Sequence, residues 1–156
     1  MSKKLLLAFD DSENAMRAVK FLIDSFDRDC RITLFGVVPD TEALCKMDSP
    51  ALTPYFRSQQ SAFCTLEDKK RELVNTAMQA AAKILTEAGF HEDNISLKLE
   101  PKKNGVARDI VKEARSGYDA IVIGRRGLSG IKDLILGSTS HKVFELAKDI
   151  SILVIN

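Results

Sequence analysis

The chain alternates between short apolar runs and longer segments with helical spacing of apolar residues, and this alternation restricts the possible folds more than any other feature. The short runs are rich in aliphatic or β-branched residues, which is typical of strands buried in a parallel sheet. Strict alternation favours right-handed crossovers, and therefore one parallel α/β sheet with helices on both faces. Strands are predicted at 5–9, 31–38, 95–99, 120–123 and 151–155, and helices at about 15–26, 65–88, 104–114 and 138–147.

Sequence signals next to two predicted helices indicate where these helices begin. Ser12 follows the first strand and is a natural N-cap. Thr65 and Asp68 resemble a capping box at the start of the 65–88 helix.

Residues 39–64 have no clean period and contain three prolines. They are therefore predicted to form a long irregular connection, of a kind that is often functional, and this connection could include a short helix or cover a neighbouring surface.

Length, charge and cysteine content limit the class of protein. The 156 residues suit a single domain over 1–156. Lys and Arg number 23 against 22 Asp and Glu, a formal charge of +1, which argues against bulk nucleic-acid binding. The apolar run at 5–9 is too short for a signal peptide or a membrane span, so a cytoplasmic location is expected. The three cysteines are odd in number, form no C-x-x-C pair, and are expected to be reduced thiols.

A glycine-rich loop after the fourth predicted strand carries the strongest local signal. It begins at Gly124, includes Gly127, and ends at Gly137 before the hydroxyl run 138–140. Glycines let a backbone approach a ligand closely, and the amides at a helix N-terminus favour an anion. An arginine at 125–126 could neutralise phosphate oxygens. The loop therefore suits a polyphosphate, and the alternative is that turn glycines simply join a strand to a helix.

The pattern G-x2-G-x9-G-S over 124–138 resembles the ATP-binding signature of the universal stress protein family. Residues 7–13 resemble the first strand of that family and its Asp-x-Ser turn. The segments 121–124 and 151–155 complete the pattern. The resemblance covers essentially the whole chain and is weakest over 39–64.

The resemblance implies a fold, a ligand and an assembly. The fold would be a doubly wound five-stranded parallel sheet of order 3-2-1-4-5, of the adenine nucleotide alpha hydrolase type. Two chains would pair through the last strand, Ser151–Ile155, and an apolar strand at a sheet edge favours such a homodimer on physical grounds as well. ATP, or else ADP or AMP, would bind together with Mg²⁺ or Mn²⁺. The implied nucleotide-binding residues are Ala8, Val37 and Ile123 around the adenine, Asp10 near adenine and ribose, and Gly124, Arg126, Gly127, Gly137, Ser138, Thr139 and Ser140 around the ribose and phosphates.

Acidic residues after the first strand raise the questions of metal binding and catalysis. Either Asp10 or Asp11 could help to hold a metal, or Asp11 could simply face solvent, as most aspartates do. No triad-like arrangement involves either histidine, His91 or His141, so no catalytic residue is assigned. The leading hypothesis is an ATP-binding regulatory module of a stress response, with at most slow ATP hydrolysis and an unidentified protein partner. The alternatives are a weak ATPase using Asp10 and Arg126, and a nucleotide-independent interaction protein that acts through 39–64.

Overall fold

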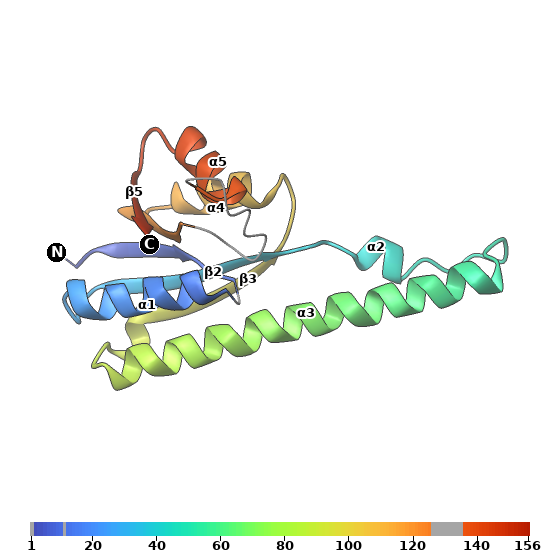
Figure 1. Ribbon diagram of the computed structural model, residues 1–156, viewed down its shortest axis with the longest axis horizontal. Coiled ribbons are helices and arrows are strands. Elements are labelled where there is room, and N and C mark those ends of the chain that lie inside the picture. The colour runs from blue at the N-terminus through green and yellow to red at the C-terminus, as the bar shows by residue number, and fades with distance from the viewer. Residues whose placement is uncertain (1, 11, 126–135) are drawn as a thin grey trace.

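The structure is a computed structural model that describes residues 2–10, 12–125 and 136–156. Its centre is a five-stranded sheet in which every strand pairs in parallel, with the order β3-β2-β1-β4-β5 (Figure 1). This confirms the predicted doubly wound α/β fold and its strand order. The strands are β1 Lys4–Ala8, β2 Arg31–Val38, β3 Ile95–Pro101, β4 Ala120–Gly124 and β5 Ser151–Ile155.

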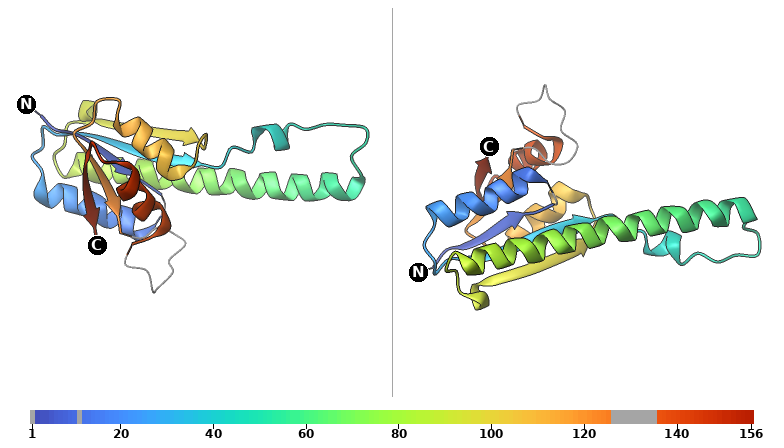
Figure 2. Two further views of the ribbon diagram at one scale, coloured as in Figure 1. Left: turned by 90° about the horizontal axis from the view of Figure 1, so that it is seen from above. Right: turned by 60° about the horizontal axis from the view of Figure 1, so that its bottom comes forward.

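Helices cover both faces of this sheet (Figures 1 and 2). Successive side chains of a strand point to opposite faces. Leu5 and Leu7 of β1 therefore pack with α1 and α3, whereas Leu6 packs with α4 and α5. Ser12 caps α1 as predicted, since its Oγ accepts a hydrogen bond from the amide of Ala15 at 3.2 Å. The helices are α1 Glu13–Ser25, α2 Glu42–Cys45, α3 Pro54–Glu87, α4 Val106–Ala114 and α5 Ser138–Leu146, with a short 3₁₀ helix, η1, at Glu92–Asn94.

The helix α3 begins well before the predicted start at Thr65, so the predicted capping box is wrong, and the 39–64 connection contains the short helix α2 and the first turns of α3. Thr53 is the N-cap, and its Oγ1 accepts from the amide of Phe56 at 3.2 Å. The hydroxyl of Thr65 instead donates to the carbonyl of Ser61 inside the helix at 2.9 Å. The contacts of α3 with the hydrophobic core begin only at Val74, and the preceding turns project beyond the sheet (Figures 1 and 2). Only two members of the apolar face of these turns, Phe56 and Phe63, precede Thr65, and two residues are too few to reveal a helical period in the sequence, which explains the error.

A disulfide joins the segment before α3 to α3 itself. Cys45 and Cys64 are bonded, so the expectation of three reduced thiols is wrong, and Cys30 is a buried free thiol. The side-chain amide of Gln60 donates to the carbonyl of Met47 at 3.0 Å and fastens the same segment.

Within the described parts of the chain, no helix is sufficiently long and apolar to span a bilayer.

Candidate functional site

The strand order reverses between β1 and β4, at the centre of the sheet. Ala8 pairs with Ile123 where these two strands end. Asp10, two residues after β1, and Gly124, the last residue of β4, therefore lie at strand ends that are side by side, as the sequence predicted. In open α/β sheets, ligands bind beyond the carboxyl ends of the strands at such a reversal point.

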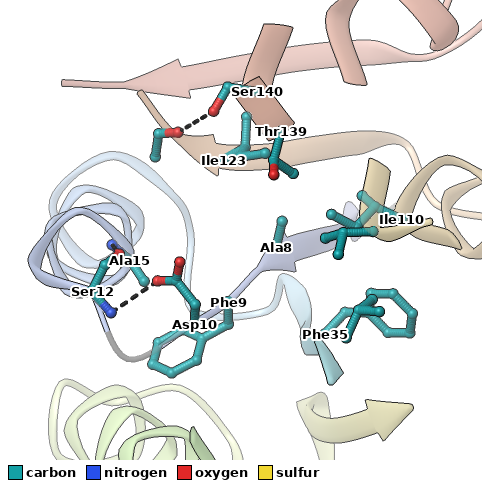
Figure 3. Close-up of a pocket in the computed structure, with 13 residues that line it drawn as sticks. Ala8, Phe9, Asp10, Ser12, Ala15, Phe35, Ile110, Ile123, Thr139 and Ser140 are labelled. Carbon is teal, nitrogen blue, oxygen red and sulfur yellow. Dashed lines mark hydrogen bonds between the residues drawn. The ribbon is translucent and has the colours of Figure 1, made fainter. Parts of the chain in front are cut away.

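A hollow with a volume of about 260 Å³ opens at this reversal point (Figure 3). Its floor is apolar and includes Ala8, Val37 and Ile123, one residue from each of three strands. These three residues, predicted to surround an adenine, therefore lie together. The full lining consists of Ala8, Phe9, Asp10, Ser12, Ala15, Phe35, Val37, Val106, Ile110, Ile123, Gly124, Thr139 and Ser140.

Five apolar lining residues were not predicted as site residues, and three of them lie on β2 and α4. Phe35 lies two residues before Val37 on β2, so strand alternation places both on the same face and could have identified it. Val106 and Ile110 come from α4 and are separated by one helical turn. Their position depends on α4 crossing this face of the sheet, which the sequence pattern of a single helix does not reveal.

Polar groups at the rim of the hollow are partly held by hydrogen bonds within the chain. The Oδ1 atom of Asp10 accepts from the amide of Ser12 at 2.9 Å, which fixes the carboxylate beside the hollow (Figure 3). The hydroxyl of Ser140 is buried and donates to the carbonyl of Gly124 at 2.8 Å. Ser140 thus joins α5 to the end of β4, and its oxygen can only accept from a further group.

The N-terminus of α5 borders the hollow and presents amide groups. Gly137 is the N-cap, and the first amide of the helix that bonds back within it is that of His141, to the carbonyl of Gly137 at 2.9 Å. The amides of residues 138–140 precede that bond and lack acceptors within the helix, as at every helix start. Together with the helix dipole, such amides favour an anion. Ser138 is exposed and Thr139 partly buried beside these amides.

A second hollow, with a volume of about 190 Å³, adjoins the first and shares Val106 and Thr139 with it. Arg108 of α4 and Lys142 of α5 contribute cationic side chains to its lining. Neither cation was singled out from the sequence, because their proximity arises only from the packing of α4 against α5. Arg126 and Gly127, which were predicted to lie near the phosphates, fall outside the described residues. The lining is Asn104, Gly105, Val106, Ala107, Arg108, Ser138, Thr139 and Lys142.

Gly124 serves close packing in addition to lining the hollow. A Cβ atom at this position would lie 2.8 Å from Cβ of Asn14 and 3.1 Å from the backbone C and O atoms of Asn14. Real Cβ atoms essentially never approach other atoms within 3.0 Å. The absence of a side chain therefore allows the start of α1 to approach the end of β4, and this approach shapes one wall of the site.

The donor groups in the site agree with a metal ion bound mainly by a ligand's phosphates. Among residues 2–10, 12–125 and 136–156, no three His, Cys, Asp or Glu side chains form a metal-binding group. Asp10 is the acidic residue among the described residues that line the first hollow, and Asp11 lies outside the described residues. A nucleotide-associated Mg²⁺ commonly uses one or two carboxylates together with phosphate oxygens and water. One carboxylate beside an anion site fits that arrangement.

Comparison with known proteins gives concordant results. The family model described as the universal stress protein family matches residues 1–155. The universal stress protein YxiE of Bacillus subtilis (strain 168) is 28% identical over 151 residues, which cover 94% of this chain and 95% of that protein. The structure of universal stress protein UspA from Lactobacillus plantarum superposes with a TM-score of 0.74 at 21% identity, covering 99% of this chain and 97% of UspA.

Two of the similar solved structures contain nucleotides. One is a universal stress protein family protein from Arabidopsis thaliana with AMP bound, with 18% identity, a TM-score of 0.58, and coverage of 98% of this chain and 90% of that chain. The other is a universal stress protein in complex with cAMP, with 15% identity, a TM-score of 0.60, and coverage of 99% and 97%. Structural likeness at these identities shows a shared fold. The match of the family model over residues 1–155 shows more: this chain belongs to the universal stress protein family.

Proposed function

We propose that this protein is a regulatory module that binds an adenine nucleotide, ATP with Mg²⁺ or Mn²⁺ in the first instance, at the ends of β1 and β4. The observation that carries the proposal is the combination of an apolar hollow with an adjoining cationic hollow at the start of α5. The AMP and cAMP complexes of similar proteins support an adenine nucleotide as the ligand class. A stress-response role in the cytoplasm, through an unidentified protein partner, completes the proposal.

The first hollow suits the base and the ribose. Ala8 has a small side chain and lies between Asp10 and Thr139 in Figure 3, so a flat ring can lie above the strand ends. Burial of an aromatic base against Val37 and Ile123 would be driven by the hydrophobic effect. The carboxylate of Asp10 can accept hydrogen bonds from ribose hydroxyls or from an exocyclic amine.

The second hollow suits the phosphates. The α5 amides can donate to phosphate oxygens, and Arg108 and Lys142 can offset their charge. Any hydrolysis is expected to be slow, because Asp10 is the one acidic side chain among the described residues that line the first hollow. Phosphoryl transfer depends on positioning and charge neutralisation by several groups acting together.

The first test is calorimetric titration of ATP and Mg²⁺ into the wild type, Val106→Asp and Val106→Thr. Val106 is 36% exposed and lines both hollows, and an acidic residue in the first turn of a helix is favourable for the fold. The carboxylate should repel the phosphates and weaken binding at least about tenfold, whereas the threonine should change it less than about threefold. Undetectable binding of ATP, ADP and AMP to the wild type at about 1 mM would refute the proposed function.

A second comparison tests the phosphate end of the site. Lys142→Ala removes a cation from the second hollow, and Lys148→Ala removes an exposed cation that lines neither hollow of the site. Lys142→Ala should weaken the binding of ATP about three- to tenfold and leave the binding of adenosine almost unchanged. Equal effects of the two variants would place the phosphates elsewhere.

The homodimer is proposed to form through β5, the edge strand of the sheet next to β4. The carbonyl of Ile155 faces the β4 side of the strand, since it accepts a hydrogen bond from the amide of Arg125, directly after β4, at 2.7 Å. Peptide groups alternate in direction along a strand, so the amide of Val154 faces the open edge. Phe144 is 61% exposed beside Ile150 and Ile152, which adds apolar surface next to that edge.

Val154→Pro tests the β5 pairing. Proline is tolerated on an edge strand where the missing amide faces solvent, so the monomer should fold while pairing between two β5 strands is blocked. Leu153→Pro is the matched control, because its amide faces β4 and its loss should destabilise the monomer itself. A dimer of unchanged affinity in Val154→Pro, measured by sedimentation equilibrium, would contradict pairing through β5.

A further inference from the structure

An exposed apolar stripe runs along the part of α3 that projects beyond the sheet. It consists of Phe56, Phe63, Leu66 and Leu73, which are 40%, 40%, 52% and 58% exposed. The contacts of α3 with the hydrophobic core start only after the stripe, at Val74. The stripe is therefore not a continuation of the packed core, and α3 displays it over the length seen free of the sheet in Figures 1 and 2.

The spacing of the stripe is that of a helix-pairing seam. Its members are separated by seven, three and seven residues, so Phe56 and Phe63 occupy successive a positions, and Leu66 and Leu73 successive d positions, of a heptad repeat. At 3.6 residues per turn they fall within a sector about 100° wide. The segment 39–53 occupies a neighbouring sector, because it is fastened to α3 through Cys64, Gln60 and Arg57. The stripe is thus left open by the rest of the described chain.

A helix of this kind requires a covering partner. About 20 residues of α3 precede the core contacts, so the apolar face of this stretch is not packed against the hydrophobic core. The two phenylalanines and two leucines of the stripe also leave apolar area exposed. Burying it would contribute about 25 cal/mol of hydrophobic stabilisation per Å². Most helical stability in proteins comes from packing an apolar face against another element.

The stripe is complementary to itself when a second copy is placed antiparallel. If each residue i faces residue 129 − i of the second copy, Phe56 meets Leu73 and Phe63 meets Leu66. The remaining a and d positions in this register are Gln59 and Lys70, which also face each other. Apolar residues thus meet apolar residues and polar meet polar in every layer, as a two-fold symmetric contact requires.

We propose that two copies of this chain pair through the projecting parts of α3, antiparallel, about a two-fold axis between Cys64 and Thr65. The overlap from Phe56 to Leu73 spans about 27 Å at 1.5 Å per residue. It ends where the core contacts begin at Val74, so the tip of each projection meets the globular part of the other copy. With an additional two-fold contact at β5, each dimer can associate with further copies, which gives a larger assembly. The pairing does not depend on nucleotide binding.

The test uses the Val154→Pro background, so that only the α3 contact remains, and nucleotide-free protein, so that the proposed function is not involved. Phe63→Asp places a charge in the central layer and should raise the dissociation constant at least about tenfold in sedimentation equilibrium. Ser61→Asp is the matched control on the opposite, exposed face of the same helix, and should change it less than about twofold. Circular dichroism is the control, and both variants should remain as helical as the background protein.

The register is tested at the polar layer. Gln59→Glu would face Lys70 of the second copy and should tighten association about two- to fivefold, whereas Gln59→Lys should weaken it by a similar factor. A background protein that remains monomeric at about 1 mM would overturn the pairing. Association that is indifferent to Phe63→Asp, or to the sign of the charge at position 59, would overturn it too. Because no nucleotide is present in these experiments, a failure of ATP binding in a separate titration would contradict only the proposed function.

Discussion

Gly124→Ala should destabilise the protein even without any ligand, because Gly124 allows the start of α1 to pack against the end of β4. The added methyl group would lie 2.8 Å from Cβ of Asn14 and 3.1 Å from its backbone C and O atoms. These contacts involve the main chain of a helix start, which cannot rotate away as a side-chain end can. Either α1 or β4 must shift, and the hollow at the ends of β1 and β4 must change shape with it.

The expected size of the effect follows from two opposing contributions. Forcing an extra methyl group into a packed site costs about 1–3 kcal/mol. Replacing glycine by alanine in a strand returns about 0.5–1 kcal/mol of backbone entropy. The midpoints give a net loss of unfolding free energy of about 1 kcal/mol, within limits of about 0 and 2.5 kcal/mol, which is a few degrees in Tm for a chain of this length.

Urea denaturation of the nucleotide-free protein measures this loss, with Gly36→Ala as the graded control. At Gly36 the closest atom to an added Cβ is Cδ1 of Leu99, 2.9 Å away at the flexible end of a side chain. Gly36→Ala should accordingly cost less than Gly124→Ala, at equal m-values. A Gly124→Ala protein as stable as the wild type would refute the argument that close packing, rather than a ligand alone, requires glycine here.

Two further predictions concern the rest of the fold. The Tyr118 hydroxyl lies 3.1 Å from Oγ1 of the buried Thr33, so Tyr118→Phe should cost about 1–2 kcal/mol of unfolding free energy at pH 7. Burial raises the pKa of Tyr118 above its usual value, so this stabilisation is complete below pH 10. As the pH rises further, the difference in unfolding free energy between wild type and variant should narrow. A difference that stays constant in denaturation curves would contradict the assignment. Cys45→Ser, or a reducing agent, should accelerate proteolytic cleavage within 46–53, because the disulfide fastens this segment to α3. Limited proteolysis with mass spectrometry measures the cleavage. An unchanged rate would contradict the prediction and mean that the hydrogen bonds of Gln60 hold the segment without the disulfide.

The parts of the fold that the sequence predicted well are those in which local pattern and burial agree. The strands at 31–38 and 151–155 and the cap at Ser12 match the structure because buried strands and capped helix starts carry their own local signals. The start of α3 was misplaced because its first turns lack contact with the core. The bond between Cys45 and Cys64 was missed for a related reason, since the helical turn that brings the two sulfurs together lies in the segment predicted to be irregular.

The candidate site shows the same division between local and packing information. Ala8, Val37 and Ile123 were implied by the family resemblance, and they line one hollow because their strands end at one edge of a parallel sheet. Lys142 and Val106 could not, because their positions depend on how α4 and α5 pack on one face and on each other. Gly124 lines the hollow as predicted, but its contact with α1 emerges only in three dimensions.

The measurement that tests the central claim most directly is an NMR titration of the isotope-labelled wild type with ATP and Mg²⁺, which follows each backbone amide. We expect saturable shifts at Ala8, Val37, Ile123 and Thr139, which line the hollow at the strand ends. Amides of the projecting part of α3, such as that of Phe63, should stay unchanged under conditions in which the assembly is constant. Saturable shifts confined to other regions, or no saturable shifts at about 1 mM ATP, would contradict adenine nucleotide binding at this site.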